Sequence, residues 1–314
     1  MDPPAAMSEP FVSTTPADPP RPTTDELEAL PLAPPAATGL REVFRRRYLL
    51  GMLVRNTIQS RYQGTVLGWL WSYLQPAIRF CMFYFLFEVM IGRGAGTIEN
   101  FAIHLFAGMV IVHFFTETFN GGTQSLVQNR SLITKLPVPR EMFPVARMLV
   151  AAWHTVPMLV ILLIPCVALG WRPDAVGMAA ALLGFSLAAA LGLALGLLFS
   201  VGNVFMRDVG KIAQTLTMFV TFSVPMMYSY TLVEDRFGET GARLYLYNPM
   251  AEAVLLMQRG FWVGTNEDPA ATIAVNLPDH LFTRGLIMTA IALVLLVLAQ
   301  RVFSKLESKV PERL

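Results

Sequence analysis

The chain has 314 residues, of which 54% are hydrophobic and only 15% are charged, and its mean hydropathy of +0.51 lies well above that of an ordinary soluble domain. The formal net charge of +2 is too small to indicate a nucleic-acid-binding protein. Apolar stretches of about 20 residues recur along the chain, and each is long enough to cross the hydrocarbon core of a bilayer. The sequence therefore predicts an all-α polytopic membrane protein whose spans form one bundle.

Metal, disulfide and catalytic chemistry have little support in the sequence. Cys81 and Cys166 both lie in apolar runs, and none of the four histidines has a His or Cys partner at i+3 or i+4. The phosphate-binding pattern G-x-x-x-x-G-K-[ST] of ATPases is absent, because Ile212 follows the pair Gly210-Lys211. The D-x-D pair expected of a metal-dependent glycosyltransferase is also absent. We therefore expect no catalytic residue, no metal and no cofactor bound by this chain.

The chain begins with a tail at 1–40 that contains nearly half of the 22 prolines and a large excess of Asp and Glu over basic residues. This composition predicts disorder. An amphipathic helix rich in arginine is predicted within 41–65. It lies along the membrane interface or forms a solvated basic collar, and both interpretations place it in the cytoplasm. Its apolar positions at helical spacing are Phe44, Tyr48, Met52 and Leu53.

A transmembrane domain is predicted at 66–304, followed by a cytoplasmic tail at 305–314. Basic residues gather before the first span, in the loops near 124–140 and 203–211, and in that tail, whereas the opposite side has fewer. The positive-inside rule therefore places both termini in the cytoplasm. The six predicted spans are 69–91, 101–123, 142–169, 175–202, 210–232 and 284–303.

The connection between the last two predicted spans contains an apolar segment, 247–262, that is too short to cross a bilayer. Such a segment can dip into the membrane and return, so we predict a re-entrant segment before the last span. In the fourth span, Gly192 and Gly196 form a G-x-x-x-G step, which is typical of two helices in close contact.

Charged residues inside the predicted spans need an explanation, because a lipid-exposed charge costs at least about 2.5 kcal/mol at the membrane centre. Arg79 lies well inside the first span and should face protein or water. One explanation is an ion pair with Glu117 that only holds the bundle together. An ion-coupled carrier would instead need a functional carboxylate within the membrane, for which Glu88 and Glu117 are the candidates.

Aromatic residues occupy one face of the first predicted span. When the helix is projected at 100° per residue, they fall within about 60° of each other. Aromatic rings present flat apolar surfaces to the C–H faces of sugars, so the stripe indicates either a surface along which a glycan slides or ordinary helix packing. The residues of this aromatic face are Trp69, Tyr73, Phe80, Tyr84 and Phe87.

The segment from Arg61 to Pro76, RYQGTVLGWLWSYLQP, resembles the start of the first span in the permease subunits of ABC-2-type exporters. The resemblance is greatest to the Wzm-like and TagG-like permeases, which move lipid-linked polysaccharides or teichoic acids, and it covers about 45–310. Supporting matches are Lys135-Leu-Pro-Val-Pro-Arg140, Phe205-Met-Arg-Asp208 and Asn248-Pro249.

The resemblance implies a transport subunit, not an enzyme, that works as a homodimer with two copies of a separate cytoplasmic ABC ATPase, on which ATP and Mg bind. It assigns the helix at 41–62 and the two cytoplasmic loops to the ATPase contact, and it makes 247–262 a gate at the outer mouth. The residues implied for coupling to the ATPase are Arg45, Arg46, Arg47, Arg130, Lys135, Arg140, Arg207 and Asp208. The residues implied for lining a channel are Trp69, Tyr73, Arg79, Phe80, Tyr84 and Phe87. The residues implied for the gate are Asn248, Pro249, Glu252 and Arg259.

An exporter of this kind lies in the bacterial plasma (inner) membrane and moves a lipid-linked polysaccharide from the cytoplasmic side. The resemblance extends to the branch that exports lipid-linked cell-wall galactan in actinobacteria, but no feature of the sequence separates galactan from O-antigen or teichoic acid. The alternatives are an ABC-2 permease for a small lipid or drug and, further from the resemblance, an ion-coupled carrier or a membrane enzyme.

Overall fold

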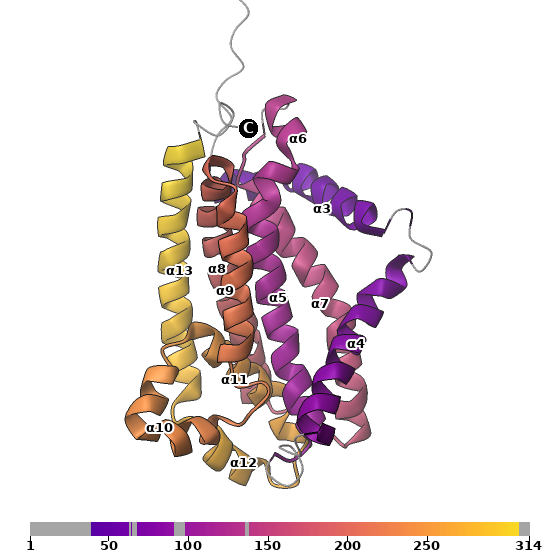
Figure 1. Ribbon diagram of the computed structural model, residues 1–314, viewed down its shortest axis with the longest axis vertical. Coiled ribbons are helices and arrows are strands. Elements are labelled where there is room, and N and C mark those ends of the chain that lie inside the picture. The colour runs from indigo at the N-terminus through magenta and orange to yellow at the C-terminus, as the bar shows by residue number, and fades with distance from the viewer. Residues whose placement is uncertain (1–38, 63, 65–67, 91–97, 136–137, 308–314) are drawn as a thin grey trace, which may run out of the picture. The chain divides into compact units, whose positions relative to one another are not determined.

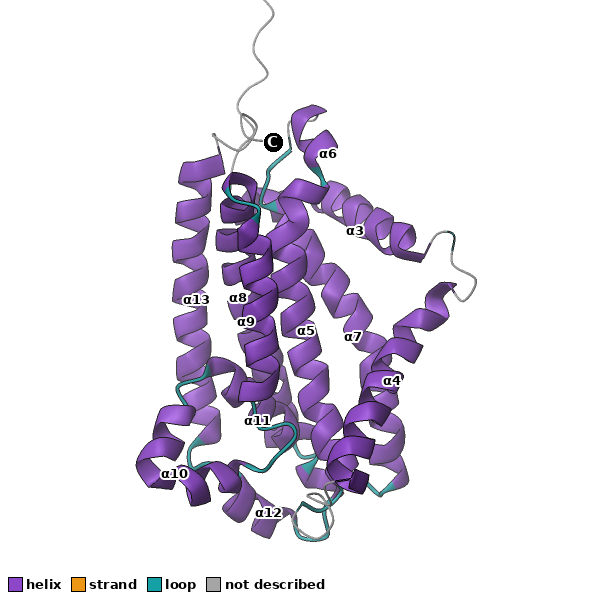
Figure 2. Ribbon diagram, viewed as in Figure 1, coloured by secondary structure: helices purple, strands orange, loops and turns teal. Residues whose placement is uncertain are grey.

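The computed structural model describes residues 39–62, 64, 68–90, 98–135 and 138–307. Residues 1–38 of the predicted acidic tail and most of the predicted C-terminal tail therefore lie outside the described residues. The predicted end of the acidic tail at residue 40 is slightly too late, because Leu40 begins a helix. Every element within the described ranges is helical, as the sequence predicts (Figure 2). The helices that are long and apolar enough to cross a bilayer are α5 (Phe101–Gln128), α7 (Met142–Ala168), α8 (Ala175–Phe205) and α13 (Leu281–Leu306).

Helix α5 lies at the centre of the bundle and is the most buried of these four helices. It packs against α7 and α8, and α8 also packs against α13 (Figure 1). Small residues allow this close approach, because a Cβ added at Gly122 would lie 3.0 Å from the Cα of Gly196. A Cβ added at Gly192 would lie 3.0 Å from the Cγ2 of Thr118. The predicted close contact at the G-x-x-x-G step is thus confirmed.

The first predicted span corresponds to a shorter helix that is extended by other helical turns. The turn η1 (Gly68–Leu70) leads into α4 (Trp71–Tyr84), and α4 continues directly into the π-helical segment η2 (Phe85–Met90). Together these elements cover most of the predicted span at 69–91. Pro76 lies inside α4 and is buried.

The fifth predicted span, 210–232, corresponds to α9 (Asp208–Ser223), and its predicted C-terminal boundary is wrong. At about 1.5 Å per residue, the 16 residues of α9 cover roughly 24 Å. Pro225 explains the early end, because a proline disfavours helical geometry at the residue before it. Val224 is accordingly extended, with φ −109° and ψ 150°.

The N-terminal segment forms two helices, α2 (Leu40–Arg45) and α3 (Arg47–Tyr62), where the sequence predicts one. Val43 and Leu50 are buried in a cluster that includes residues of α7 and α13. Phe44 and Tyr48 are instead 62% and 77% exposed, and Met52 is also exposed, so this stripe faces away from the bundle. An exposed apolar stripe among arginines is typical of a helix that lies in the membrane interface.

Several short elements follow α9, and they gather at the end of the bundle opposite α3 and α6 (Arg130–Lys135) (Figure 1). They are α10 (Tyr230–Tyr245), α11 (Pro249–Phe261), η3 (Val263–Thr265) and α12 (Pro269–Asn276). Helix α11 is almost completely buried and packs against α5, α8 and α13. Its 13 residues cover only about 20 Å, too short to cross a bilayer, which agrees with the predicted re-entrant segment.

Candidate functional site

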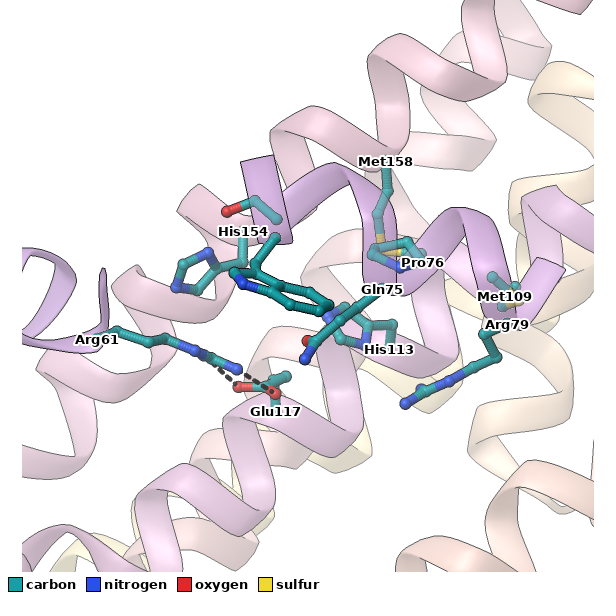
Figure 3. Close-up of a pocket in the computed structure, with 11 residues that line it drawn as sticks. Arg61, Gln75, Pro76, Arg79, Met109, His113, Glu117, His154 and Met158 are labelled. Atoms are coloured by element: carbon teal, nitrogen blue, oxygen red, sulfur yellow. Dashed lines mark hydrogen bonds and ion pairs between the residues drawn. The ribbon is translucent and has the colours of Figure 1, made fainter. Parts of the chain in front are cut away.

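Two adjoining cavities lie along one face of α5. The first has a volume of about 310 Å³ and is lined by residues of α3, α4, α5 and α7 (Figure 3). The second has a volume of about 490 Å³ and extends along α5 to α9. The residues that line both cavities are Arg61, Arg79, His113 and Glu117.

Helix α5 contributes a stripe of polar side chains to these cavities. His113, Glu117, Asn120, Gln124 and Gln128 recur at spacings of three or four residues, so they share one face of the helix. Polar residues inside an apolar span usually face protein or a water-filled cavity and mark a functional site. We call this stripe the polar face of α5.

An ion pair connects α3 to the polar face. The two terminal nitrogens of Arg61 donate to the two carboxylate oxygens of Glu117 at 3.2 and 3.3 Å (Figure 3). A helix rises about 1.5 Å per residue, so Glu117 lies roughly 16 Å along α5 from its last residue, Gln128. The paired geometry fixes the last turn of α3 against the middle of the bundle.

The predicted ion pair between Arg79 and Glu117 is wrong, because Glu117 is the partner of Arg61. Arg79 extends into the same cavities from α4 and forms no ion pair among the described residues (Figure 3). A third guanidinium enters from α7, where Arg147 packs its aliphatic carbons against Gly121. Arg147 also donates to the side-chain oxygen of Gln128.

The residues of the aromatic face whose side chains the structure describes are all half-buried. Phe80 makes an edge contact with Phe106 of α5 at 4.9 Å between ring centroids and stacks on Tyr84 at 5.8 Å. Phe87 also packs against the core, and Tyr73 is half-buried. The side chain of Trp69 lies outside the described residues. Among the predicted channel residues whose side chains the structure describes, Arg79 lines these cavities, and the role of the others stays a prediction.

The residues predicted to contact an ATPase gather at the end of the bundle formed by α2, α3, α6 and the α8–α9 corner (Figure 1). Arg46 pairs with Glu42 at 2.7 Å, and Arg140 donates to the backbone carbonyl of Glu307. Arg45 and Asp208 form looser pairs, with Glu42 at 3.8 Å and with Lys211 at 3.6 Å. The side chain of Lys135 lies outside the described residues. The exposed residues of the set are Arg45, Arg47, Arg130, Arg207 and Asp208.

The predicted gate segment is fixed at both ends of α11. Asn248 caps the helix by accepting a hydrogen bond from the backbone N–H of Met250 at 3.0 Å, and Pro249 occupies its first turn. At the other end, Arg259 donates two hydrogen bonds of 2.8 Å to Asp174, just before α8. This guanidinium holds the pKa of the Asp174 carboxyl below its ordinary value.

Glu252 lies in the first turns of α11 and is completely buried. The Nε atom of Arg284, at the start of α13, lies 3.8 Å from its carboxylate. Sequence reasoning identified Glu252 but not its partner, because Arg284 lies far along the chain at a predicted span boundary.

The sequence did not identify several of the residues that line the cavities. Its histidines suggested only possible metal ligands, and Arg61 belonged to a basic helix and to the segment 61–76 that carries the family resemblance. Arg147 carried the clearest signal, since it lies inside the predicted span at 142–169 and needs a polar environment as Arg79 does. His113 and Asn120 share the helical face of Glu117, a pattern that was visible in the sequence.

Membrane-length apolar helices around a polar cavity define a polytopic α-helical membrane protein. Residues 48–258 match the family model described as ABC-2 type transporter, and the chain belongs to that family.

Among known proteins, the chain is similar to one named O-antigen export system permease protein RfbA from Myxococcus xanthus. The two are 28% identical over 225 residues, which cover 71% of this chain and 84% of the relative. Two proteins of the same name from Klebsiella pneumoniae are 23% and 22% identical over 272 residues, which cover 84% of this chain and 94% of each relative.

Proposed function

We propose that this chain is the transmembrane permease subunit of an ATP-driven ABC exporter that moves a lipid-linked polysaccharide out of the cytoplasm. The polar face of α5 is the observation that carries the proposal. A half-exposed row of polar side chains at membrane depth is unfavourable against lipid, but it is suited to the wall of a hydrated path. The names of the similar permeases, which refer to O-antigen export, support a polysaccharide as the cargo.

We expect a second copy of the chain to pack over the polar face of α5. Helices α4 and α9 flank the polar face, and both carry exposed apolar side chains, such as Ile78 and Met82 on α4 and Phe219 and Phe222 on α9. Two copies that meet through α4 and α9 would bury these apolar groups and enclose the two polar faces between them. The homodimer thus forms a channel from two equal halves.

The energy for export comes from a separate cytoplasmic ATPase that contacts the α2–α3 segment, α6 and the α8–α9 corner. The exposed charges at this end, together with the absence of a phosphate-binding loop in the sequence, support this assignment. It places both termini in the cytoplasm and the protein in the plasma membrane of a bacterium, which agrees with the distribution of basic residues. ATP and Mg bind to the ATPase and not to this chain.

Cell-wall galactan is the cargo that we propose to test first. The permease and its partner ABC ATPase are reconstituted together in lipid vesicles, and the movement of a lipid-linked galactan across the bilayer is followed by its accessibility to a galactan-degrading enzyme. We expect movement only with hydrolysable ATP and with both subunits, and no ATP hydrolysis by the permease alone. ATP turnover by the purified permease, or movement without the ATPase, would contradict the proposal.

The same assay separates the alternatives. A permease for small lipids or drugs would leave the glycan in place while moving a fluorescent short-chain lipid. An ion-coupled carrier would stop when an ionophore collapses the proton and sodium gradients, whereas an ATP-driven exporter continues. The pairing of Glu117 with Arg61 gives this intramembrane carboxylate a structural role that does not require ion coupling.

A further inference from the structure

A buried carboxylate lies at the corner that leads into α7, at the end of the bundle where α3 and α6 lie. Glu141 is completely buried there, and no basic side chain in the described ranges forms an ion pair with it. Arg140, its neighbour in the sequence, donates instead to the backbone carbonyl of Glu307. A buried carboxylate without a basic partner is costly unless hydrogen bonds replace its hydration. The groups that donate to Glu141 therefore indicate its role.

All the hydrogen bonds described for this carboxylate converge on one oxygen, Oε1. The backbone N–H of Gly39 donates to it at 2.9 Å, and the side-chain amide of Gln300 donates at 2.8 Å. The hydroxyl of Ser304, one turn further along α13, donates at 3.5 Å. Gly39 precedes α2, and Gln300 lies near the end of α13, so Glu141 joins three distant parts of the chain.

Gly39 has a backbone conformation that suits this contact. Its φ of +113° is rarely adopted by residues other than glycine. Its N–H donates to Glu141, while its carbonyl oxygen accepts hydrogen bonds from the N–H groups of Glu42 and Val43 and so begins α2. A Cβ at Gly39 would meet nothing within 4 Å, so the glycine is needed for its conformation and not for space.

The contact fixes the start of a segment that has two different sides. Val43 and Leu50 are buried in a cluster with residues of α7 and α13. Arg45 and Arg47 lie on the other side and are exposed. The corner at Glu141 also follows α6, which lies at the same end of the bundle as α3 (Figure 1). Glu141 thus connects the α2–α3 segment to the loop that carries α6.

We infer that Glu141 is a positioning residue that holds the α2–α3 segment and the α6–α7 loop together as one docking surface for the ATPase. Because Glu141 is completely buried, it acts through the segment that it anchors. The exposed arginines of α2 and α3 keep a fixed place relative to α6 while Gly39 is bound. The docking role rests on the proposed function, whereas the anchoring contact does not.

The anchor is measured in the permease alone. A nitroxide spin label is attached at Arg45→Cys in a chain that lacks its two native cysteines, in lipid nanodiscs, and its mobility is read from the electron paramagnetic resonance spectrum. We expect Glu141→Leu to make the label more mobile, because leucine cannot accept the N–H of Gly39. Glu141→Gln keeps a carbonyl oxygen and should retain most of the restriction. A label at Ile212→Cys, exposed on α9, should be equally mobile in all variants if the bundle stays folded.

Glycine variants test the contact from the other side and leave the buried carboxylate in place. Gly39→Ala should also release the label at Arg45, because alanine is strained at a φ of +113°. Gly51→Ala, in the same segment, is the matched control, since a Cβ there meets nothing within 4 Å and a helix accepts alanine. A label that is as restricted in Glu141→Leu and Gly39→Ala as in wild type would overturn the anchor.

The docking role is measured as the concentration of the partner ATPase that gives half-maximal stimulation. We expect Glu141→Leu and Gly39→Ala to raise this concentration about tenfold, because a released segment must be ordered on binding. The hydrolysis rate at saturation should change less, by about twofold at most, since the docked complex is the same. Glu141→Gln and Gly51→Ala should behave nearly as wild type does. A more mobile label with an unchanged half-saturating concentration would overturn the docking role.

The two proposals fail separately. If the wild-type permease binds no ATPase, the exporter assignment and the docking role fail, and the label mobility still decides whether Glu141 is an anchor. If the wild-type system exports glycan but all variants have the wild-type mobility and the wild-type ATPase requirement, the role of Glu141 fails and the exporter assignment stands.

Discussion

Glu117 and Arg61 link two parts of the chain that differ in character, because Arg61 ends a basic helix and Glu117 lies within an apolar span. Their side chains are 32% and 42% exposed, so the pair is partly hydrated and contributes modestly to stability. Its main consequence is geometric: any displacement of α3 must break, or carry with it, the contact to the polar face. The sequence predicted Arg79 as the partner of Glu117 and did not identify Arg61, because the actual pairing depends on how α3 and α4 approach α5.

Single glycines also determine how closely two helices pack. Gly122→Val should lower the free energy of unfolding by about 1–3 kcal/mol, because its side chain would meet the backbone of Gly196. Thermal unfolding in detergent measures the effect. Gly51→Ala is the control, since a Cβ at Gly51 meets nothing within 4 Å and alanine favours the helix. Equal melting temperatures for Gly122→Val and wild type would contradict the close approach of α5 and α8.

The contact between Asp174 and Arg259 predicts a dependence on pH. Because Arg259 lowers the pKa of Asp174 from 3.8, the stabilisation is present above that value and is lost as the pH falls through the lower pKa of the folded state. Asp174→Asn should therefore lower the melting temperature at neutral pH, and the difference from wild type should shrink below about pH 4. Asp235→Asn, on the exposed surface of α10, should behave as wild type does. A constant difference across this pH range would argue against the pair.

At the scale of elements, the spans were predictable because hydropathy is a local property. The four longest helices follow the predicted spans, whereas the end of α9 was missed because the effect of Pro225 was not weighed against the apolar run that continues past it. The division of the N-terminal helix into α2 and α3 was also missed. There the buried side is set by contacts of Val43 and Leu50 with distant helices, which the pattern of arginines does not reveal.

The proposed contact between the α8–α9 corner and the ATPase can be tested with substitutions that do not disturb the fold. Asp208 and Lys211 form an exposed pair at 3.6 Å, which contributes at most about 1 kcal/mol. Charge reversal by Arg207→Glu or Asp208→Arg should therefore leave the melting temperature unchanged but weaken the stimulation of the partner ATPase severalfold. Arg243→Glu, at the opposite end of the bundle, is the control. Normal stimulation in both corner variants would remove this corner from the ATPase contact.

At the scale of the whole molecule, the proposed function explains two features together: a partner ATPase would supply the phosphate-binding motif that the sequence lacks, and a second copy of the chain would cover the polar face. The candidate cavity was only partly predictable. Arg79 was recognised because it is a charge in an apolar run, but the convergence of Arg61, Arg147 and the polar face depends on the crossing of several helices. No local pattern contains that information.

The central claim is that the polar face of α5 lines the path of the exported glycan. It is tested by placing single cysteines at Asn120 and Gln124 of the polar face, and at Thr116, which lines the same cavity, in a chain whose Cys81 and Cys166 are replaced and that is reconstituted with the ATPase. We expect a membrane-impermeant thiol reagent to modify these positions and the lipid-linked glycan, trapped during export, to protect them. Leu182→Cys, on the exposed side of α8, should stay unmodified with or without cargo, because a thiol that faces lipid is out of reach of the reagent. Modification that is absent, or that is unchanged by the cargo at all three positions, would contradict the account.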